Sequence, residues 1–260
     1  MWARSLFLLL FALLSTVSMA SALGLNDVIN ALEIPFKATA TKDRGTPTSG
    51  IYDFQADFFQ ESQIDSIDRV QRGRGEVSFK FQRLNLVDAP LAMFRWEYRE
   101  PTDQEIISDG RTLWVYQPDN RQVIESDISQ AAGQQSDNPV SFLSGLGNLS
   151  RDFNIRWGAP NIDREGNYVL ELEPRRNSPL IRTLRIVVDR NAVNDYVENN
   201  RTGEYFPILA TMVNDPNDNR TTIEFQDIRV NRDLSESFFV FHRPAGVEVV
   251  HPEETYPGFQ

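Results

Sequence analysis

Few side chains in this sequence have the type and spacing needed for acid–base catalysis or metal binding. The carboxylates that lie closest to one another form three pairs: Asp53 and Asp57, Glu97 and Glu100, and Asp215 and Asp218. Two carboxylates can divide the general-acid and general-base roles of a hydrolytic enzyme. The first pair, however, falls on the solvent face of an expected strand, and the last lies in a turn without the residue order of a calcium-binding loop. We expect no catalysis from these pairs.

The other reactive residue types lead to the same expectation. His242 and His251 have no neighbours with metal-ligand or catalytic-triad spacing, so surface positions are the simpler interpretation. Gly73-x-Gly75 is followed by neither a helix nor the Lys-Ser/Thr of a phosphate-binding loop. The chain has no cysteine, which excludes disulfides, thiol catalysis, thiolate metal sites and the lipid attachment of a bacterial lipoprotein. The sequence therefore predicts no metal, no cofactor and no enzymatic activity.

The distinctive chemistry of the sequence is apolar. Phe94, Trp96 and Tyr98 are spaced two apart, so in an extended strand they project from the same face and form one aromatic wall. This wall belongs either to the packed core of a sheet or to the lining of a cavity for an apolar ligand. Trp114 and Tyr116 repeat the spacing further along the chain, but the pattern alone does not assign them to a face.

The charge of the chain limits the kinds of partner. The sequence holds 26 Lys and Arg against 37 Asp and Glu, a net charge of -11. Nucleic acid and anionic lipid both repel such an acidic surface. The charges are scattered, which is typical of a soluble surface. We expect no nucleic-acid partner.

The N-terminus has the three parts of a secretory signal peptide. Arg4 precedes an apolar run over residues 6–14, and the small residues Ala20-Ser21-Ala22 follow. As a helix the apolar run spans only about 14 Å, less than half of the hydrocarbon layer. Residues 1–22 are therefore interpreted as a cleaved signal peptide; a retained membrane anchor is the alternative.

The elements that must position the aromatic wall are mostly strands. Asp109-Gly110 is a strong hairpin signal between two of them, and stretches 63–73 and 189–196 have the composition of turns. The spacing of about ten residues, without helices between the first strands, predicts antiparallel connections. Alternation of apolar and polar residues predicts strands at 52–58, 77–81, 94–98, 105–108, 112–116, 121–126, 153–157, 168–173, 184–189, 206–213, 221–230 and 238–241.

Helical periodicity is limited to short segments. Residues 25–33 fit an amphipathic helix that ends before Pro35, and a polar loop follows at 37–50. Asn138-Pro139 is a favourable helix start, and glycines inside the segment keep it short and soft. The apolar side chains of this second helix are unusually many: Val140, Phe142, Leu143, Leu146 and Leu149.

These elements predict one domain over residues 23–250, with a C-terminal tail at 251–260. A single curved sheet with two or three short helices has too little apolar cover to fill its concave face, and a partly unfilled concave face is a ligand site. Two sheets packed on each other, with an ordinary core, remain the alternative.

The order of several motifs resembles the periplasmic outer-membrane lipoprotein carrier proteins, the LolA family. The resemblance extends from about Leu25 to Val250. It rests on Phe54-x-Ala56-x-Phe58-x-Gln60, Gly73-x-Gly75-Glu76, Phe94-Arg95-Trp96-x-Tyr98-x-x-Pro101, Ser108-Asp109-Gly110-Arg111-Thr112-Leu113-Trp114-x-Tyr116, Asn138-Pro139 with Leu143 and Gly145, and Phe239-x-Phe241-x-x-Pro244-x-Gly246-Val247.

The resemblance implies a mainly β fold with a few short α-helices: a single incomplete antiparallel β-barrel of about eleven strands with a helical lid over an apolar concave face. It implies a monomeric periplasmic carrier without cofactors. Such a carrier takes acylated lipoproteins from an ATP-driven inner-membrane transporter and passes them to an outer-membrane acceptor. The residues expected to face the acyl chains are Phe54, Phe58, Phe79, Phe94, Trp96, Val140, Phe142 and Leu143.

The sequence departs from the family pattern in two places. The join at 83–92 is longer than the compact Arg-Pro turn of the relatives, so Arg83 is only a candidate for their lid-holding arginine, and a surface arginine is an equal alternative. The loop at 37–50 is the second departure. Two other functions stay open: a lipid- or lipoprotein-sensing regulatory protein of the same fold, and an enzyme with an apolar pocket.

Overall fold

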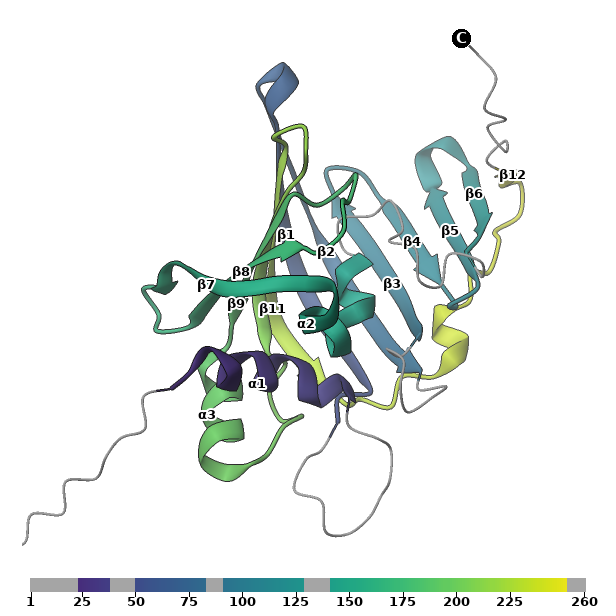
Figure 1. Ribbon diagram of the computed structural model, residues 1–260. Helices are drawn as coiled ribbons and strands as arrows, with labels where there is room; N and C mark the ends of the chain where they lie inside the picture. The colour runs from purple at the N-terminus through teal and green to yellow at the C-terminus, as the bar shows by residue number, and fades with distance from the viewer. Residues whose placement is uncertain (1–22, 38–49, 83–90, 129–140, 252–260) are drawn as a thin grey trace, which may run out of the picture.

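The protein folds as a single unclosed sheet (Figure 1). The computed structural model describes residues 23–37, 50–82, 91–128 and 141–251. The twelve strands of these residues lie in the order β12-β6-β5-β4-β3-β2-β1-β11-β10-β9-β8-β7. The predicted incomplete barrel is confirmed, with twelve strands in place of about eleven.

Most strands that are adjacent in the sheet are also consecutive in the sequence. Adjacent strands pair in antiparallel fashion except for β12, which pairs in parallel with β6. Their bounds are β1 (Asp53–Ile64), β2 (Arg69–Gln82), β3 (Leu91–Glu100), β4 (Gln104–Ser108), β5 (Thr112–Gln117), β6 (Gln122–Asp127), β7 (Phe153–Ile162), β8 (Tyr168–Pro174), β9 (Thr183–Val188), β10 (Ile208–Asn214), β11 (Arg220–Val230) and β12 (Glu248–Val250).

Short helices cover one side of this sheet. The longer ones are α1 (Leu25–Lys37) and α3 (Arg190–Asn199); α2 (Leu149–Asp152) continues directly from the 3-10 helix η4 (Ser141–Asn148). Within the described ranges, three further 3-10 turns are η1 (Asp65–Ile67), η2 (Pro118–Asn120) and η5 (Glu236–Phe239). In Figure 1, α2 lies in front of β2 and β3, and α1 crosses below it beside α3. None of the described helices is long and apolar enough to span a membrane.

Two sequence predictions about helices were wrong. The first helix continues past Pro35 to Lys37. The stretch interpreted as a turn at 189–196 forms the cap and most of α3, because Asp189 caps the helix by accepting a hydrogen bond from Asn191 N at 2.8 Å. The short helix predicted after Pro139 is confirmed in its described part, which is a 3-10 helix followed by one α-helical turn.

Two strand predictions were also wrong. The polar stretch 63–73 is not a turn but the far end of the β1–β2 hairpin, with only η1 at its tip. The expected strand at 238–241 is instead the 3-10 turn η5 and the chain that follows it.

The core lies between the concave face of the sheet and the helices. The rings of Phe54 and Phe79 stack at 5.2 Å on neighbouring strands, and Phe206 approaches Phe54 to 4.1 Å. Phe36 of α1 meets Phe81 edge to face at 5.0 Å, so the helix extends the same aromatic cluster.

The two glycines of β2 have a structural role. A Cβ at Gly75 would lie 1.8 Å from the backbone oxygen of Glu97, so no other residue fits there without a shift of the backbone. A Cβ at Gly73 would lie 3.1 Å from the ring of Tyr98. These glycines let β3 and its aromatic side chains approach β2 closely.

Asp53 was expected on the solvent face of its strand, and the structure corrects this. Asp53 is 1% exposed. Its carboxylate accepts hydrogen bonds from Arg232 N at 2.7 Å and Leu234 N at 3.2 Å, in the chain that leaves β11. A buried carboxylate is stable with such donors, and this one fastens a turn.

Candidate functional site

The strand register brings most of the predicted site residues onto one face. Directly opposite residues of antiparallel strands share a face. One row across β1, β2 and β3 is Phe54, Phe79 and Phe94, and the next is Ala56, Val77 and Trp96. This is the concave face, since its side chains form the core together with those of the helices.

The inner part of this face is closely packed. Phe54, Phe58, Phe79 and Trp96 are buried, and the rings of Phe58 and Trp96 lie 4.7 Å apart. Phe94 is half-buried and contacts Phe79 at 5.5 Å between ring centroids. A ligand reaches these side chains only if the segment that covers them moves.

Residues 141–152 (η4 and α2), called the lid below, cover the inner part. Leu143 and Leu146 of η4 and Leu149 of α2 are fully buried in the core. α1 packs against η4. Of the predicted lid residues, Leu143 therefore faces the aromatic cluster. Val140 and Arg83 lie outside the described residues, and so does the side chain of Phe142.

The concave face continues beyond the aromatic wall as an open apolar strip. Ile106 lies opposite Trp96, Val115 lies opposite Ile106, and Ile124 lies opposite Val115. Leu113 belongs to the same face, and all four aliphatic side chains are only half-buried. Sequence reasoning missed this strip because Ile106 and Ile107 are adjacent, so alternation did not identify the inward residue.

The register also decides the positions of Trp114 and Tyr116. Ile107 lies opposite both Arg95 and Trp114, which places them on the convex face. The chain after β11 crosses this face: the ring of Phe241 lies 5.2 Å from that of Tyr116. These aromatic side chains therefore do not line the concave face.

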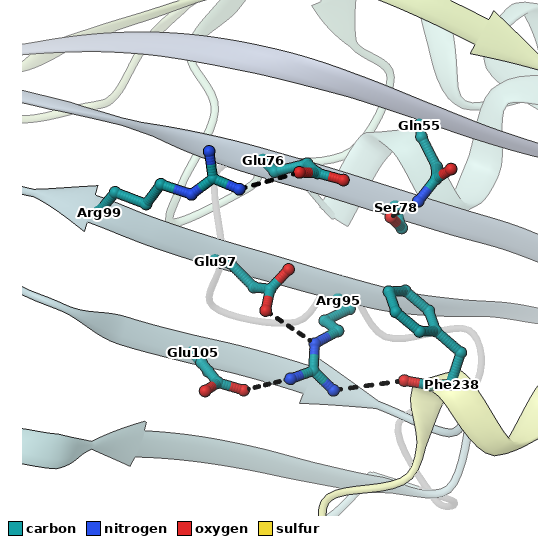
Figure 2. Close-up of polar contacts among 8 residues, drawn as sticks. All are labelled: Gln55, Glu76, Ser78, Arg95, Glu97, Arg99, Glu105 and Phe238. Atoms are coloured by element: carbon teal, nitrogen blue, oxygen red, sulfur yellow. Dashed lines mark hydrogen bonds and ion pairs between the residues drawn. The ribbon is translucent and has the colours of Figure 1, made fainter.

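Arg95 fastens the same crossing chain to the sheet. It forms ion pairs with Glu97 at 3.1 Å and Glu105 at 2.6 Å, and donates to the carbonyl of Phe238 at 3.4 Å (Figure 2). Its guanidinium also lies 5.3 Å from the centroid of the Phe238 ring. Burial raises the pKa of Glu105, and the positive charge of Arg95 opposes that rise. We assign this cluster a structural role.

Polar groups at the rim of the aromatic wall are fixed. The hydroxyl of Tyr98 donates to Gln60 Oε1 at 2.8 Å, and burial raises its pKa to about 12.

His242 and His251 are exposed, as predicted. Asp215 accepts hydrogen bonds from Asn217 N and Asn219 N within its turn. Among the described residues, no three His, Cys, Asp or Glu side chains are grouped to hold a metal ion.

A separate cavity of about 280 Å³ lies between the start of α3 and β11. Its lining includes Asp189, Glu204 and Asp227 along with Phe206 and Phe225. Burial raises the pKa of Asp189, which disfavours its charged form. This volume is slightly below the usual range for ligand sites, and its lining is partly acidic, so it suits an acyl chain poorly.

Together these features define the class of unclosed β-barrel proteins whose apolar concave face is partly covered by short helices. The chain belongs to the LolA family: residues 49–242 match the family described as outer membrane lipoprotein carrier protein LolA.

Relatives extend the match over most of the chain. An outer-membrane lipoprotein carrier protein of Nitrosomonas europaea is 29% identical over 220 residues, 84% of this chain and 92% of that protein. The Pseudomonas aeruginosa protein of the same description is 30% identical, covering 75% of this chain and 79% of that protein. The crystal structure of a LolA superfamily protein from Nitrosomonas europaea covers 85% of this chain and 99% of its own, with 15% identity and a TM-score of 0.39.

Proposed function

We propose that this protein is a periplasmic carrier that binds the acyl chains of lipoproteins released from the inner membrane and delivers them to the outer membrane. Membership of the lipoprotein carrier family supports this role. The observation that carries the proposal is the continuous apolar concave face, which is packed under the lid on β1–β3 and half-open on β4–β6.

The acyl chains first contact the open strip of Ile106, Leu113, Val115 and Ile124. They then displace the lid and lie along the residues predicted from the sequence: Phe54, Phe58, Phe79, Phe94, Trp96, Val140, Phe142 and Leu143. No covalent step is needed, so the protein acts without a cofactor and is not an enzyme.

The free energies of burial favour displacement of the lid by an acyl chain. Exposing the three buried leucines of the lid costs about 5 to 9 kcal/mol, at about 1.5 to 3 kcal/mol for each side chain. A single acyl chain of about sixteen carbons gains about 12 kcal/mol if it is fully buried, at about 0.8 kcal/mol per methylene. Both figures are relative to water, so for a chain that has already left the bilayer, one chain is enough to replace the lid leucines on the aromatic cluster.

The partners follow from this role. The protein, after removal of residues 1–22, works as a monomer between an ATP-driven inner-membrane transporter and an outer-membrane acceptor. The full sequence has a net charge of -11, which is consistent with an acidic carrier that does not adsorb to anionic membranes on its own.

Release of a lipoprotein from transporter-containing membranes tests the proposal. The purified protein, residues 23–260, is added with ATP to vesicles that hold the transporter and a triacylated lipoprotein. We expect soluble carrier–lipoprotein complex in a one-to-one ratio. Lipoprotein that stays in the vesicles, while a known carrier releases it, would contradict the proposal.

Two variants of one strand locate the site. Val115→Gln places a polar side chain on the concave face, and Thr112→Gln makes a comparable change on the convex face of β5. We expect release to fall roughly tenfold in the first variant, because an amide buried against an acyl chain lacks a partner, and to stay unchanged in the second. Equal release by both would exclude the open strip as part of the site.

A further inference from the structure

Glu33 is a carboxylate buried between α1 and the lid. Its side chain is 3% exposed. Oε1 accepts a hydrogen bond from the backbone N–H of Ser150 at 2.5 Å, and Oε2 accepts one from Ser150 Oγ at 3.0 Å. Both oxygens of the carboxylate thus bind the same residue of the lid.

Lys37 compensates the charge of this carboxylate from the same helix. Its Nζ lies 2.5 Å from Glu33 Oε2, one helical turn further along α1. The lysine side chain is 46% exposed, so its own charge stays hydrated. Because both members of the ion pair belong to α1, the pair persists when the lid moves away.

A second contact between α1 and the lid, at Gly147, is apolar and close. A Cβ at Gly147 would lie 3.5 to 3.6 Å from atoms of Lys37 and Phe36, so the backbone of η4 packs directly on the last turn of α1. Apolar contacts of this kind are non-directional, and an acyl chain can replace them. The hydrogen bonds to a charged acceptor are directional, and a lipid chain offers no substitute for them.

We infer that Glu33 is the positioning residue that holds the lid closed, acting through Ser150, and that loading requires Ser150 to leave this carboxylate. This inference rests on the proposed function, because it concerns when the acyl-binding face is uncovered. Lys37 limits the free-energy cost of opening the lid, because the Glu33 carboxylate keeps its ion pair with Lys37 when Ser150 leaves. The lid is therefore held to α1 by hydrogen bonds between Ser150 and Glu33, which can break without leaving the Glu33 carboxylate as an unpaired buried charge.

Hydrogen–deuterium exchange on the purified protein, without any lipoprotein, tests the inference. Glu33→Leu removes both acceptors, whereas Glu33→Gln keeps one carbonyl oxygen for Ser150 N. We expect exchange of the lid amides to rise about tenfold to hundredfold in the Leu variant and by less in the Gln variant, while amides of β1 and β11 keep their protection.

Asp27→Ala is the matched control at the other end of α1. Asp27 Oδ2 accepts a hydrogen bond from Gly24 N at 2.8 Å. We expect its loss to loosen the first turn of α1 and leave lid exchange unchanged.

Three outcomes decide the matter. Faster exchange confined to the lid in the Leu variant, with partial recovery in the Gln variant, supports the inference. Unchanged lid exchange in both variants overturns it, and so does an equal rise in the lid and the core strands, which would show a purely structural role. If the wild-type protein fails in the lipoprotein release assay, the proposed function falls, but the exchange result still stands.

Discussion

The two halves of the sheet differ in how they bury side chains. In β9, every second residue is buried and the residues between them are half-buried, so one face is core. In β5, all six residues are half-buried. One half buries its concave face in a closed aromatic and aliphatic core. In the other half, Ile107 and Val123 of the convex face are buried, and the aliphatic side chains of the concave face are only half-buried. The two halves of one continuous sheet thus pack their concave faces to different extents.

The covers of the two halves explain the difference. α1 and the lid lie over the concave face of the first half. In the second half, η5 and the chain after it cover the convex face through Phe238 and Phe241, and the described helices leave the concave strip half-exposed. A carrier needs both conditions, because a fully packed face binds nothing and a fully open one aggregates.

Truncation of a core ring should give the largest effect. Phe54→Ala is expected to lower the free energy of unfolding by about 3 to 5 kcal/mol, because the ring is fully buried among other rings. Ile124→Ala, in the open half, should cost about 1 kcal/mol, since its side chain is already half-exposed. Urea unfolding of both variants measures the contrast. Equal losses would contradict the division into two halves.

Gly75→Ala should give the second largest effect and lower the free energy of unfolding by about 2 to 4 kcal/mol. Its Cβ would overlap the backbone oxygen of Glu97 and push β3 away from β2. Gly145→Ala is the control within the lid: its Cβ would meet no atom of the described residues within 4 Å. We expect that variant to unfold at the same or slightly higher urea concentration. A tolerated alanine at Gly75 would show that the two strands separate easily.

Phe94 lies where the two halves meet, so its substitution should separate binding from stability. Phe94→Glu places a charge on the half-buried edge of the aromatic wall. Lipoprotein release is expected to fall at least about tenfold, corresponding to about 1.4 kcal/mol or more, because an acyl chain would have to bury a carboxylate. Phe94→Leu should retain most of the release. Unchanged release by the Glu variant would refute the assignment of Phe94 to the site.

Glu105 on the convex face should give the smallest effect, as a change in pH dependence. Its pKa is raised in the folded protein by burial, so the folded state binds the proton more tightly than the unfolded state does. The stability that this carboxyl contributes is present below its ordinary pKa and is lost as the pH rises through the raised value.

Glu105→Gln tests that direction. The variant should lose less stability than the wild type between about pH 4 and pH 7, the range in which a carboxyl of raised pKa titrates. Urea unfolding at both pH values gives the two slopes. A steeper loss in the variant would mean that the pairing with Arg95 outweighs burial.

Sequence patterns predicted the covered half well, and the physical reason is simple. Where one face is buried and the other is hydrated, as along Phe54, Ala56 and Phe58, alternation is sharp. Where both faces are covered in part, as at Ile106-Ile107, alternation fails. The pairing of β5 with β4 decides on which face of the sheet Trp114 and Tyr116 lie, and a local sequence pattern does not predict that pairing.

Other failures had local causes that outweighed composition. The polar sequence of α3 has the composition of a turn, yet the Asp189 cap and the burial of Val193 make it helical. Asp53 fitted the solvent face of an alternating strand until the chain after β11 folded over it. The predicted site residues of β1, β2 and β3, such as Phe54, Phe79 and Phe94, share one face because they are apolar at regular spacing. The hydrogen bonds of Glu33 to the lid instead depend on a residue more than a hundred positions away.

The parallel pairing of β12 with β6 bears on how the protein avoids pairing with other chains. An unclosed sheet has two edges, and an exposed edge is a template for intermolecular strand addition. Here β12 occupies the edge of β6 through Glu248, Val249 and Val250. At the other edge, β7 contains Pro160, which has no N–H to offer an incoming strand. Both edges of the sheet are thus poor templates for edge-to-edge association, even while the apolar concave face is open.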